Sequence, residues 1–341
     1  MAIPIWKDKT VTLGSGASYD FEIRLGSSSG PAIYAGKAYK RPGASNTVVR
    51  INDICADWLA AGLPALAPVG FTALELAAKF SVCAYISGSW TQKELVEFYD
   101  DWSYDRLFDV SADPLSCPII AELDPRQTVL VSVINAASVT FTLTYADNTT
   151  STVVVNIAHS ADFNDDFNDD FSDLGTGSTS GAAVLDLSSF TDLVSVSANG
   201  VTWKVRQDTC ARYLVYYTNA YGGWDSLLLD GIARTSDALT RHTALREYDN
   251  NDSDQRGWKD YAVEVERNWE LNTGFLTDDQ SELMHHLLNS TDVFLYDLST
   301  GEITPVVLTD AGAQRKTYRG NGRQVIQYTF NAKEAQLQVR R

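Results

Sequence analysis

Short segments rich in Val, Ile, Thr and aromatic residues recur along this chain and constrain its fold more than any other feature. Three of them follow one another at 127–135, 138–145 and 151–157, with a polar break at 146–149. Such composition and alternation are typical of half-buried strands, and a short polar break between two of them is typical of a hairpin. We therefore predict a mainly β fold.

The length of 341 residues corresponds to two or three domains, so the fold is expected to be multidomain. We place a mixed β domain with a short helix in residues 1–115 and a β-sandwich-like domain in residues 116–231. Residues 232–341 form an α+β C-terminal assembly domain. Alternatively, the N-terminal strands complete this last domain and make it discontinuous. The sandwich would resemble the immunoglobulin type without its cysteine–tryptophan signature.

Further elements follow from the same patterns. Asn52 and Asp53 favour a helix start at 52–59, and Thr277 with Gln280 form a capping box ahead of a helix at 281–289. The segment 90–105 fits a helix or an aromatic strand, and the polar segment 235–256 predicts a long loop or flap. Other strands are expected at 19–25, 33–39, 47–51, 79–87, 183–187, 201–207, 212–218, 224–229, 260–271, 292–296, 303–309, 324–330 and 336–340.

Charge is distributed unevenly. The net charge is −17, and residues 51–200 carry 21 acidic and 4 basic residues, whereas 1–50 and 311–341 are basic. Because DNA and RNA binding requires a basic face, this balance argues against a nucleic-acid binder. An acidic middle between basic ends suits head-to-tail packing of copies. The alternative is that the charge serves solubility alone.

An acidic tract carries three tandem tetrapeptides, Asp-Phe-Asn-Asp twice and Asp-Phe-Ser-Asp once. Its six carboxylates are a weak calcium candidate, because calcium prefers several oxygen ligands. The helix–loop–helix calcium pattern does not fit, since Phe167 stands where that loop needs Gly. A basic partner patch is the better interpretation, and no cofactor is expected. The carboxylates belong to Asp162, Asp165, Asp166, Asp169, Asp170 and Asp173.

An aromatic run at 216–225 is the most distinctive local feature. Asn219 and the following glycine pair can adopt positive φ, which predicts a tight hairpin between two apolar strands. Its aromatic residues would be either interface anchors or a core aromatic hairpin. The candidate interface residues, here and in the basic C-terminal segment, are Tyr217, Asn219, Tyr221, Gly222, Gly223, Trp224, Arg315, Lys316, Arg319 and Arg323.

Signatures of catalysis are weak, and we predict no enzyme. Gly26–Gly30 matches the serine-hydrolase elbow around Ser28, but Pro31 and a strand-like run follow where a helix is required. The four histidines and four cysteines have no zinc-site spacing. Asp100, Asp101 and Asp105, near two aromatic residues, leave a glycan-cleaving enzyme as the weakest alternative.

Targeting and membrane signals are missing from the sequence as read. The longest apolar stretch, 59–71, is interrupted by Gly and Pro and is shorter than the ~20 residues that span a bilayer. No signal-peptide core is visible near Met1. We expect reduced core thiols, assembly in a cytoplasm and no membrane insertion.

Three stretches carry a resemblance to a known family: IYAGKAYKRP…VRINDICADWL (33–59), YLVYYTNAYGGWDSLLLDG (213–231) and residues 269–341, which begin WELNTGFLTDDQSELMHHLLNS. They resemble virion proteins of tailed bacteriophages that infect Bacteroidetes. The third stretch is also similar to tail-tip and baseplate ring domains. The acidic tract and the acidic middle do not match that pattern.

The resemblance implies a non-enzymatic structural subunit of the virion, at the tail tip, baseplate or tail ring. Its expected partners are further copies of itself in a ring and other tail proteins. A carbohydrate-binding module for host attachment, using exposed Trp and Tyr, is the alternative.

Overall fold

The computed structural model describes residues 3–340 apart from several gaps. The longer gaps are 100–121, 157–179, 246–257 and 311–325. The shorter ones are 57, 60–65, 67–68, 74–76, 135, 137, 208–209, 278–279 and 336–337. Strands dominate over helices by 62% to 7%, which confirms the predicted mainly β, multidomain fold.

The chain divides into two compact units. The first comprises Met1–Pro118, Pro125–Val205 and Thr218–Asp225, and the second comprises Ile119–Asp124, Arg206–Tyr217 and Ser226–Arg341. The domain boundary predicted at residue 115 lies outside the described residues, and the three-domain division stays a prediction.

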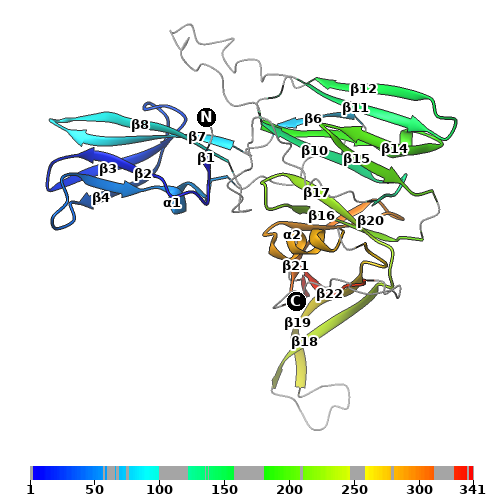
Figure 1. Ribbon diagram of the computed structural model, residues 1–341. Helices are drawn as coiled ribbons and strands as arrows, with labels where there is room; N and C mark the ends of the chain where they lie inside the picture. Colours follow the sequence, from blue (N-terminus) through cyan, green and yellow to red (C-terminus); the bar gives the residue numbers. More distant parts are fainter. Residues whose placement is uncertain are drawn as a thin grey trace, which may run out of the picture. The chain divides into compact units, whose positions relative to one another are not determined.

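The first unit begins with a sheet whose strand order is β1-β8-β7-β3-β4 (Figure 1). Phe21, Ile23, Phe80 and Val82 belong to one buried hydrophobic cluster of this sheet. The strands are β1 (Ile3–Pro4), β3 (Ser18–Leu25), β4 (Ala32–Tyr39), β7 (Ala77–Ile86) and β8 (Ser89–Tyr99). A second pair consists of β2 (Thr10–Gly14) and β5 (Thr47–Arg50).

The ambiguous segment 90–105 is resolved up to Tyr99, and its residues 100–105 lie outside the described residues. The segment from Ser89 to Tyr99 is a strand, because it pairs along its whole length with β7. The helix α1 (Asn52–Ala56) is shorter than predicted. Asn52 does not cap it: its Oδ1 accepts a hydrogen bond from the Lys9 backbone N–H, so the side chain serves another segment.

The remainder of the first unit is β-sandwich-like (Figure 1). One sheet has the order β10-β13-β6 and the other contains β12-β11-β14-β15 in that order. Strand β6 comes from the stretch before β7, yet it pairs with β13. The strands are β6 (Val69–Ala73), β10 (Thr128–Ile134), β11 (Ser138–Tyr145), β12 (Thr150–Asn156), β13 (Ser180–Asp186), β14 (Leu193–Ala198) and β15 (Val201–Val205), with a 3-10 turn η1 (Leu187–Ser189).

The second unit is built on a sheet with the order β17-β16-β20-β21-β22-β19-β18 (Figure 1). The short strand β23 also pairs with β19. The strands are β16 (Tyr213–Thr218), β17 (Trp224–Leu229), β18 (Arg234–Leu245), β19 (Trp258–Asn272), β20 (Val293–Asp297), β21 (Glu302–Leu308), β22 (Thr329–Glu334) and β23 (Gln338–Arg340). The two-residue strand β9 (Glu122–Leu123) also belongs to this unit.

The predicted capping box is confirmed in the second unit. Thr277 Oγ1 accepts from the Gln280 backbone N–H at 3.1 Å, and Gln280 Oε1 accepts from the Thr277 N–H at 3.0 Å. The turn η2 (Gln280–Glu282) and helix α2 (Leu283–Asn289) follow, with Met284 and Leu287 buried. Among the described residues, no helix has the length and apolar character needed to cross a membrane.

Two predictions for this unit are wrong. The segment 235–256 was expected to be a loop, but its first part is strand β18, because it pairs with β19. The strand predicted at 324–330 begins at Thr329, preceded by an isolated bridge between Ile326 and Leu276.

Candidate interaction surface

The aromatic run at 216–225 forms the predicted tight turn, held by Asn219. Its backbone N–H donates to the Gly223 carbonyl at 2.8 Å, and its Oδ1 accepts from the N–H groups of Tyr221 and Gly223 at 2.9 and 3.1 Å. Gly222 has a φ of 86°, whereas Asn219 is not among the residues with positive φ. Asn219 therefore stabilises the turn through its side chain.

The large aromatic residues of this run point into the protein. Tyr217 and Trp224 are fully buried, and the backbone N–H of Trp224 donates to Ser132 Oγ at 2.8 Å. Tyr221 is half-buried. The burial of Tyr217 and Trp224 matches the core-hairpin interpretation, and neither side chain is available on the surface of the isolated chain.

Several predicted site residues lie outside the described residues. They are the six aspartates of the acidic tract, the basic residues Arg315, Lys316, Arg319 and Arg323, and the carboxylates Asp100, Asp101 and Asp105. Within the described part of the chain, no group of three or more His, Cys, Asp or Glu residues is arranged to hold a metal ion.

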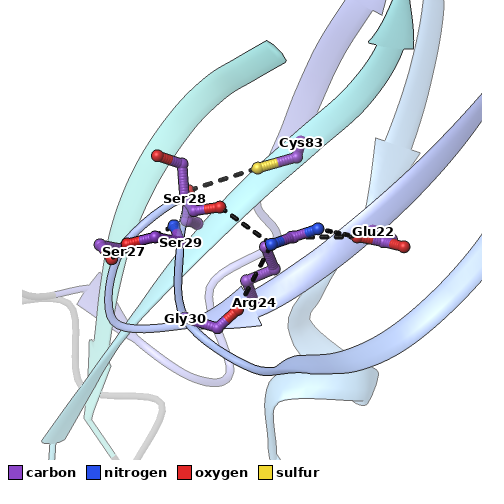
Figure 2. A network of polar contacts seen from close by, with 8 residues as sticks. Glu22, Arg24, Ser27, Ser28, Ser29, Gly30 and Cys83 are labelled. Carbon is purple, nitrogen blue, oxygen red and sulfur yellow. Dashed lines mark hydrogen bonds and ion pairs between the residues drawn. The ribbon is translucent and has the colours of Figure 1, made fainter. Parts of the chain in front are cut away.

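The serine-rich loop Gly26–Gly30 joins two strands, β3 and β4, so the strand–turn–helix context of a hydrolase elbow does not occur there. Figure 2 shows how Arg24 holds this loop. Its Nη1 donates to the Ser28 carbonyl at 3.1 Å, while its Nε and Nη2 donate to Glu22 Oε2 at 3.0 and 2.6 Å. Ser28 thus contributes its backbone carbonyl to a structural network.

Strands β18 and β19 form an exposed ribbon in the second unit: every residue of β18 except His242 is exposed, and β23 pairs with the other edge of β19 at Val263–Val265. Figure 1 shows β18 and β19 extending beyond the other strands of their sheet. The strands pair in antiparallel register from Arg234 opposite Glu270 to Leu245 opposite Trp258, with a bulge next to His242. We call β18 together with residues 258–267 of β19 the β-arm.

One face of the β-arm carries exposed apolar side chains between charged ones, because Asp237 and Arg241 lie on the same face as Leu239 and Leu245. Leu239 lies opposite Val265, and Leu245 lies opposite Trp258. Leu239, Leu245 and Trp258 are 56%, 61% and 66% exposed. Single exposed apolar residues are common on protein surfaces, but three of them on one face of a projecting ribbon, interspersed with charges, fit a contact surface.

Ion pairs connect the two strands of this ribbon. Arg241 Nη1 lies 2.8 Å from Asp260 Oδ2, and Arg267 Nε lies 3.3 Å from Asp237 Oδ1. A third pair joins Arg234 and Glu270 at 3.5 Å. Cross-strand pairs of opposite charge support the register, each by a fraction of a kcal/mol in water.

A polar groove of about 400 Å³ lies beside the base of the β-arm. Two ion pairs border it, Arg267 with Asp237 and Arg212 with Asp297. Burial opposes ionisation of Asp297, but hydrogen bonds from Ser299 and Arg212 outweigh it, so the pKa of Asp297 lies below its ordinary value. The remaining lining residues are Tyr213, Thr235, Trp269, Leu295, Glu302 and Thr304.

In comparisons with known proteins, no protein-family model and no curated protein matches this chain. The interpretation of the β-arm therefore depends on its own geometry and chemistry.

Sequence reasoning missed the β-arm because β18 has almost no strand signal of its own. Leu239 and Leu245 are the large apolar residues among its twelve. Of the twelve, His242 is half-buried and the others are exposed. The weak signal that was available is the spacing of Leu239 and Leu245 among small and charged residues, facing the strongly alternating segment of β19.

Proposed function

We propose that this chain is a non-enzymatic structural subunit of a bacteriophage virion, located at the tail tip, baseplate or tail ring. In this proposal it assembles in the cytoplasm of the host with further copies of itself and with other tail proteins. Its surfaces serve to bind neighbouring subunits, and it needs no cofactor.

The observation that carries the proposal is the β-arm. The β-arm exposes Leu239, Leu245 and Trp258 on one face, and all residues of β18 except His242 are exposed. Exposed apolar surface and strand edges are stabilised when a partner covers them, as in assembled particles. A projecting ribbon of this kind fits a protein whose working state is an assembly.

The charge distribution supports the same proposal. Residues 51–200 carry 21 acidic and 4 basic residues, and both ends of the chain are basic. Copies packed acidic region to basic region would gain electrostatic complementarity, whereas contacts between like regions would be repelled.

The proposal is tested on purified particles of the phage that encodes the chain. We expect peptide mass spectrometry to detect it in the virion, and immunogold labelling to place it at the distal end of the tail. The polymerase of the same phage serves as a control that should be absent. If the chain is as absent from the particle as that polymerase, the proposal is wrong.

A specific observation favours carbohydrate binding as the second candidate. Trp90 and Tyr85 lie side by side on β8 and β7 with their rings edge to face at 5.3 Å, and both are exposed. The Arg24 guanidinium lies 6.0 Å from the Trp90 ring centre. Exposed aromatic rings next to polar groups can stack on the apolar faces of sugars while hydrogen bonds reach the hydroxyls.

A glycan array separates this candidate from the first. If the chain is a host-attachment module, wild type binds a defined glycan and Trp90→Ala abolishes the signal. Trp58→Ala is the matched control, because Trp58 is an exposed tryptophan of the same unit that lies outside this aromatic pair. Absence of binding by wild type, or equal loss in both variants, would contradict this candidate.

A further inference from the structure

The outer edge of β18 is the largest open strand edge described in the second unit. β18 has twelve residues and stands at the end of its sheet, where the described part of the chain provides no strand on its other side. An edge strand presents outward-facing N–H and C=O groups that another strand can pair with. Natural edges are usually protected by charges, so the positions of the charges on β18 are informative.

The charges of β18 are self-complementary when two copies run antiparallel. If Leu239 lies opposite Leu239 of a second copy, Asp237 lies opposite Arg241 of that copy, and the same pair forms again by symmetry. Thr235 then lies opposite Thr243. All these side chains share the face of the β-arm that carries Val265 and Trp258.

We propose that two copies of this chain pair through the edges of β18, antiparallel about a two-fold axis at Leu239. The sheet of the second unit then continues across both copies, and the leucines form the centre of the contact. This inference goes beyond the proposed function and does not depend on it. An isologous contact closes on a pair, so it would join two copies, or two rings face to face, without itself building a ring.

The charges specify one register. Moving the axis by one residue, to Ala238 or Thr240, shifts every opposing pair by two positions. Asp237 then faces Leu239 or Thr243 of the second copy, and both opposite-charge pairs are lost. Only the axis at Leu239 places opposite charges on both sides of an apolar centre, which favours this register over its neighbours.

The ion pairs within one copy do not prevent this contact, because the paired side chains can each bind a second group. Asp237 and Arg241 are paired with Arg267 and Asp260 on β19, yet their side chains remain 48% and 59% exposed. A carboxylate accepts several hydrogen bonds and a guanidinium donates five, so each group can bind a second partner. A pair between copies, shielded by the neighbouring leucines, would be less screened than those exposed pairs.

Charge reversal in the full-length chain provides the first test. We expect wild type to form dimers in sedimentation velocity experiments, and the single variants Asp237→Arg and Arg241→Asp each to raise the dissociation constant about tenfold or more. In the double variant D237R/R241D the opposite charges face each other again, and dimerisation is restored.

This design separates the contact between copies from effects within the β-arm. The double variant loses both intramolecular pairs, with Arg267 and Asp260, so its recovery cannot come from a better-folded arm. The proposal is overturned if the double variant dimerises no better than the single ones, or if wild type is monomeric at about 100 μM. Location of the chain in virions is a separate measurement, so failure of the dimer leaves the tail proposal standing.

Cysteine cross-linking tests the register directly, with Cys117 and Cys210 replaced by Ser. Residues opposite each other on antiparallel strands have Cα atoms about 4.5–5.5 Å apart, close enough for a disulfide. Leu239→Cys should therefore give a covalent dimer under mild oxidation. Thr235→Cys is the matched control on the same face, because it faces Thr243 and not itself. Equal cross-linking of both variants, or of neither, would overturn the register.

Discussion

At the scale of single residues, the amide of Asn52 fixes the path of a segment more than forty positions away. Its Nδ2 donates to the carbonyls of Ile5 and Lys7, and its Oδ1 accepts from the Lys9 N–H at 2.7 Å. The side chain is buried. The segment between β1 and β2 has backbone groups that need hydrogen-bond partners outside the strand pairing. Asn52 alone provides a partner for three of them.

Asn52→Ala should therefore destabilise the first unit. The variant leaves buried donors and acceptors without partners, which costs about 3 kcal/mol of unfolding free energy. The measurement is urea denaturation followed by circular dichroism. Asp53→Ala is the control, because this neighbouring side chain is 82% exposed and its loss should cost under about 0.5 kcal/mol. Similar losses in both variants would contradict the assigned role.

The ionisation of Asp297 should make the stability of the folded chain depend on pH. Although burial opposes its ionisation, bonds from Ser299 and Arg212 hold its pKa below the ordinary value of 3.8. A carboxylate whose pKa is lowered by folding stabilises the folded state above its unfolded pKa, and this stabilisation is lost as the pH falls through the lowered value. Asp297→Asn should therefore lower the melting temperature at pH 7, and the difference from wild type should shrink as the pH falls below 3.8. A difference that stays constant from pH 7 to pH 2.5 would argue against this ionic contribution.

At the scale of single elements, the start of α2 depends on two side chains that stabilise each other. Thr277 and Gln280 exchange hydrogen bonds with each other's backbone N–H groups. Thr277→Ala should cost about 1 kcal/mol, because it leaves the Gln280 N–H without this acceptor. Thr277→Ser keeps the hydroxyl and should cost much less. Urea denaturation gives both values, and equal losses would show that the hydroxyl is not the stabilising group.

How well each element could be predicted depended on where its stabilisation originates. The capping box could be predicted from the sequence, because its donors and acceptors lie three residues apart. The strand β18 could not be predicted from the sequence, because its strand geometry depends on pairing with β19 and not on burial of its own side chains. The segment after Ser89 remained ambiguous until its register opposite β7 was known.

In the candidate interaction surface, too, features set by neighbouring residues could be predicted and features set by distant contacts could not. The tight turn at Asn219 could be predicted from local residue types, but the burial of Trp224 could not, because an aromatic run looks alike in a core and at an interface. The β-arm was missed for the reason that β18 was missed.

At the scale of the whole molecule, a net charge of −17 should set how association responds to salt. Two copies repel over a range that shrinks to about 10 Å at 0.1 M ionic strength, whereas ion pairs at contact are screened less. The dimer should therefore be tighter in 150 mM than in 10 mM NaCl. Sedimentation equilibrium at both concentrations checks this prediction, and weaker association at the higher concentration would contradict it.

The pairing of β6 with β13 also has a consequence for synthesis. Ala73 lies opposite Gly181, so β6 leaves the ribosome about a hundred residues before its partner. Because sequence-distant contacts slow folding, this sheet should be completed late, after the neighbouring hairpin of β7 and β8 has closed. A nascent chain arrested shortly before residue 180 would expose the unpaired backbone of β6, a natural point for a chaperone to bind.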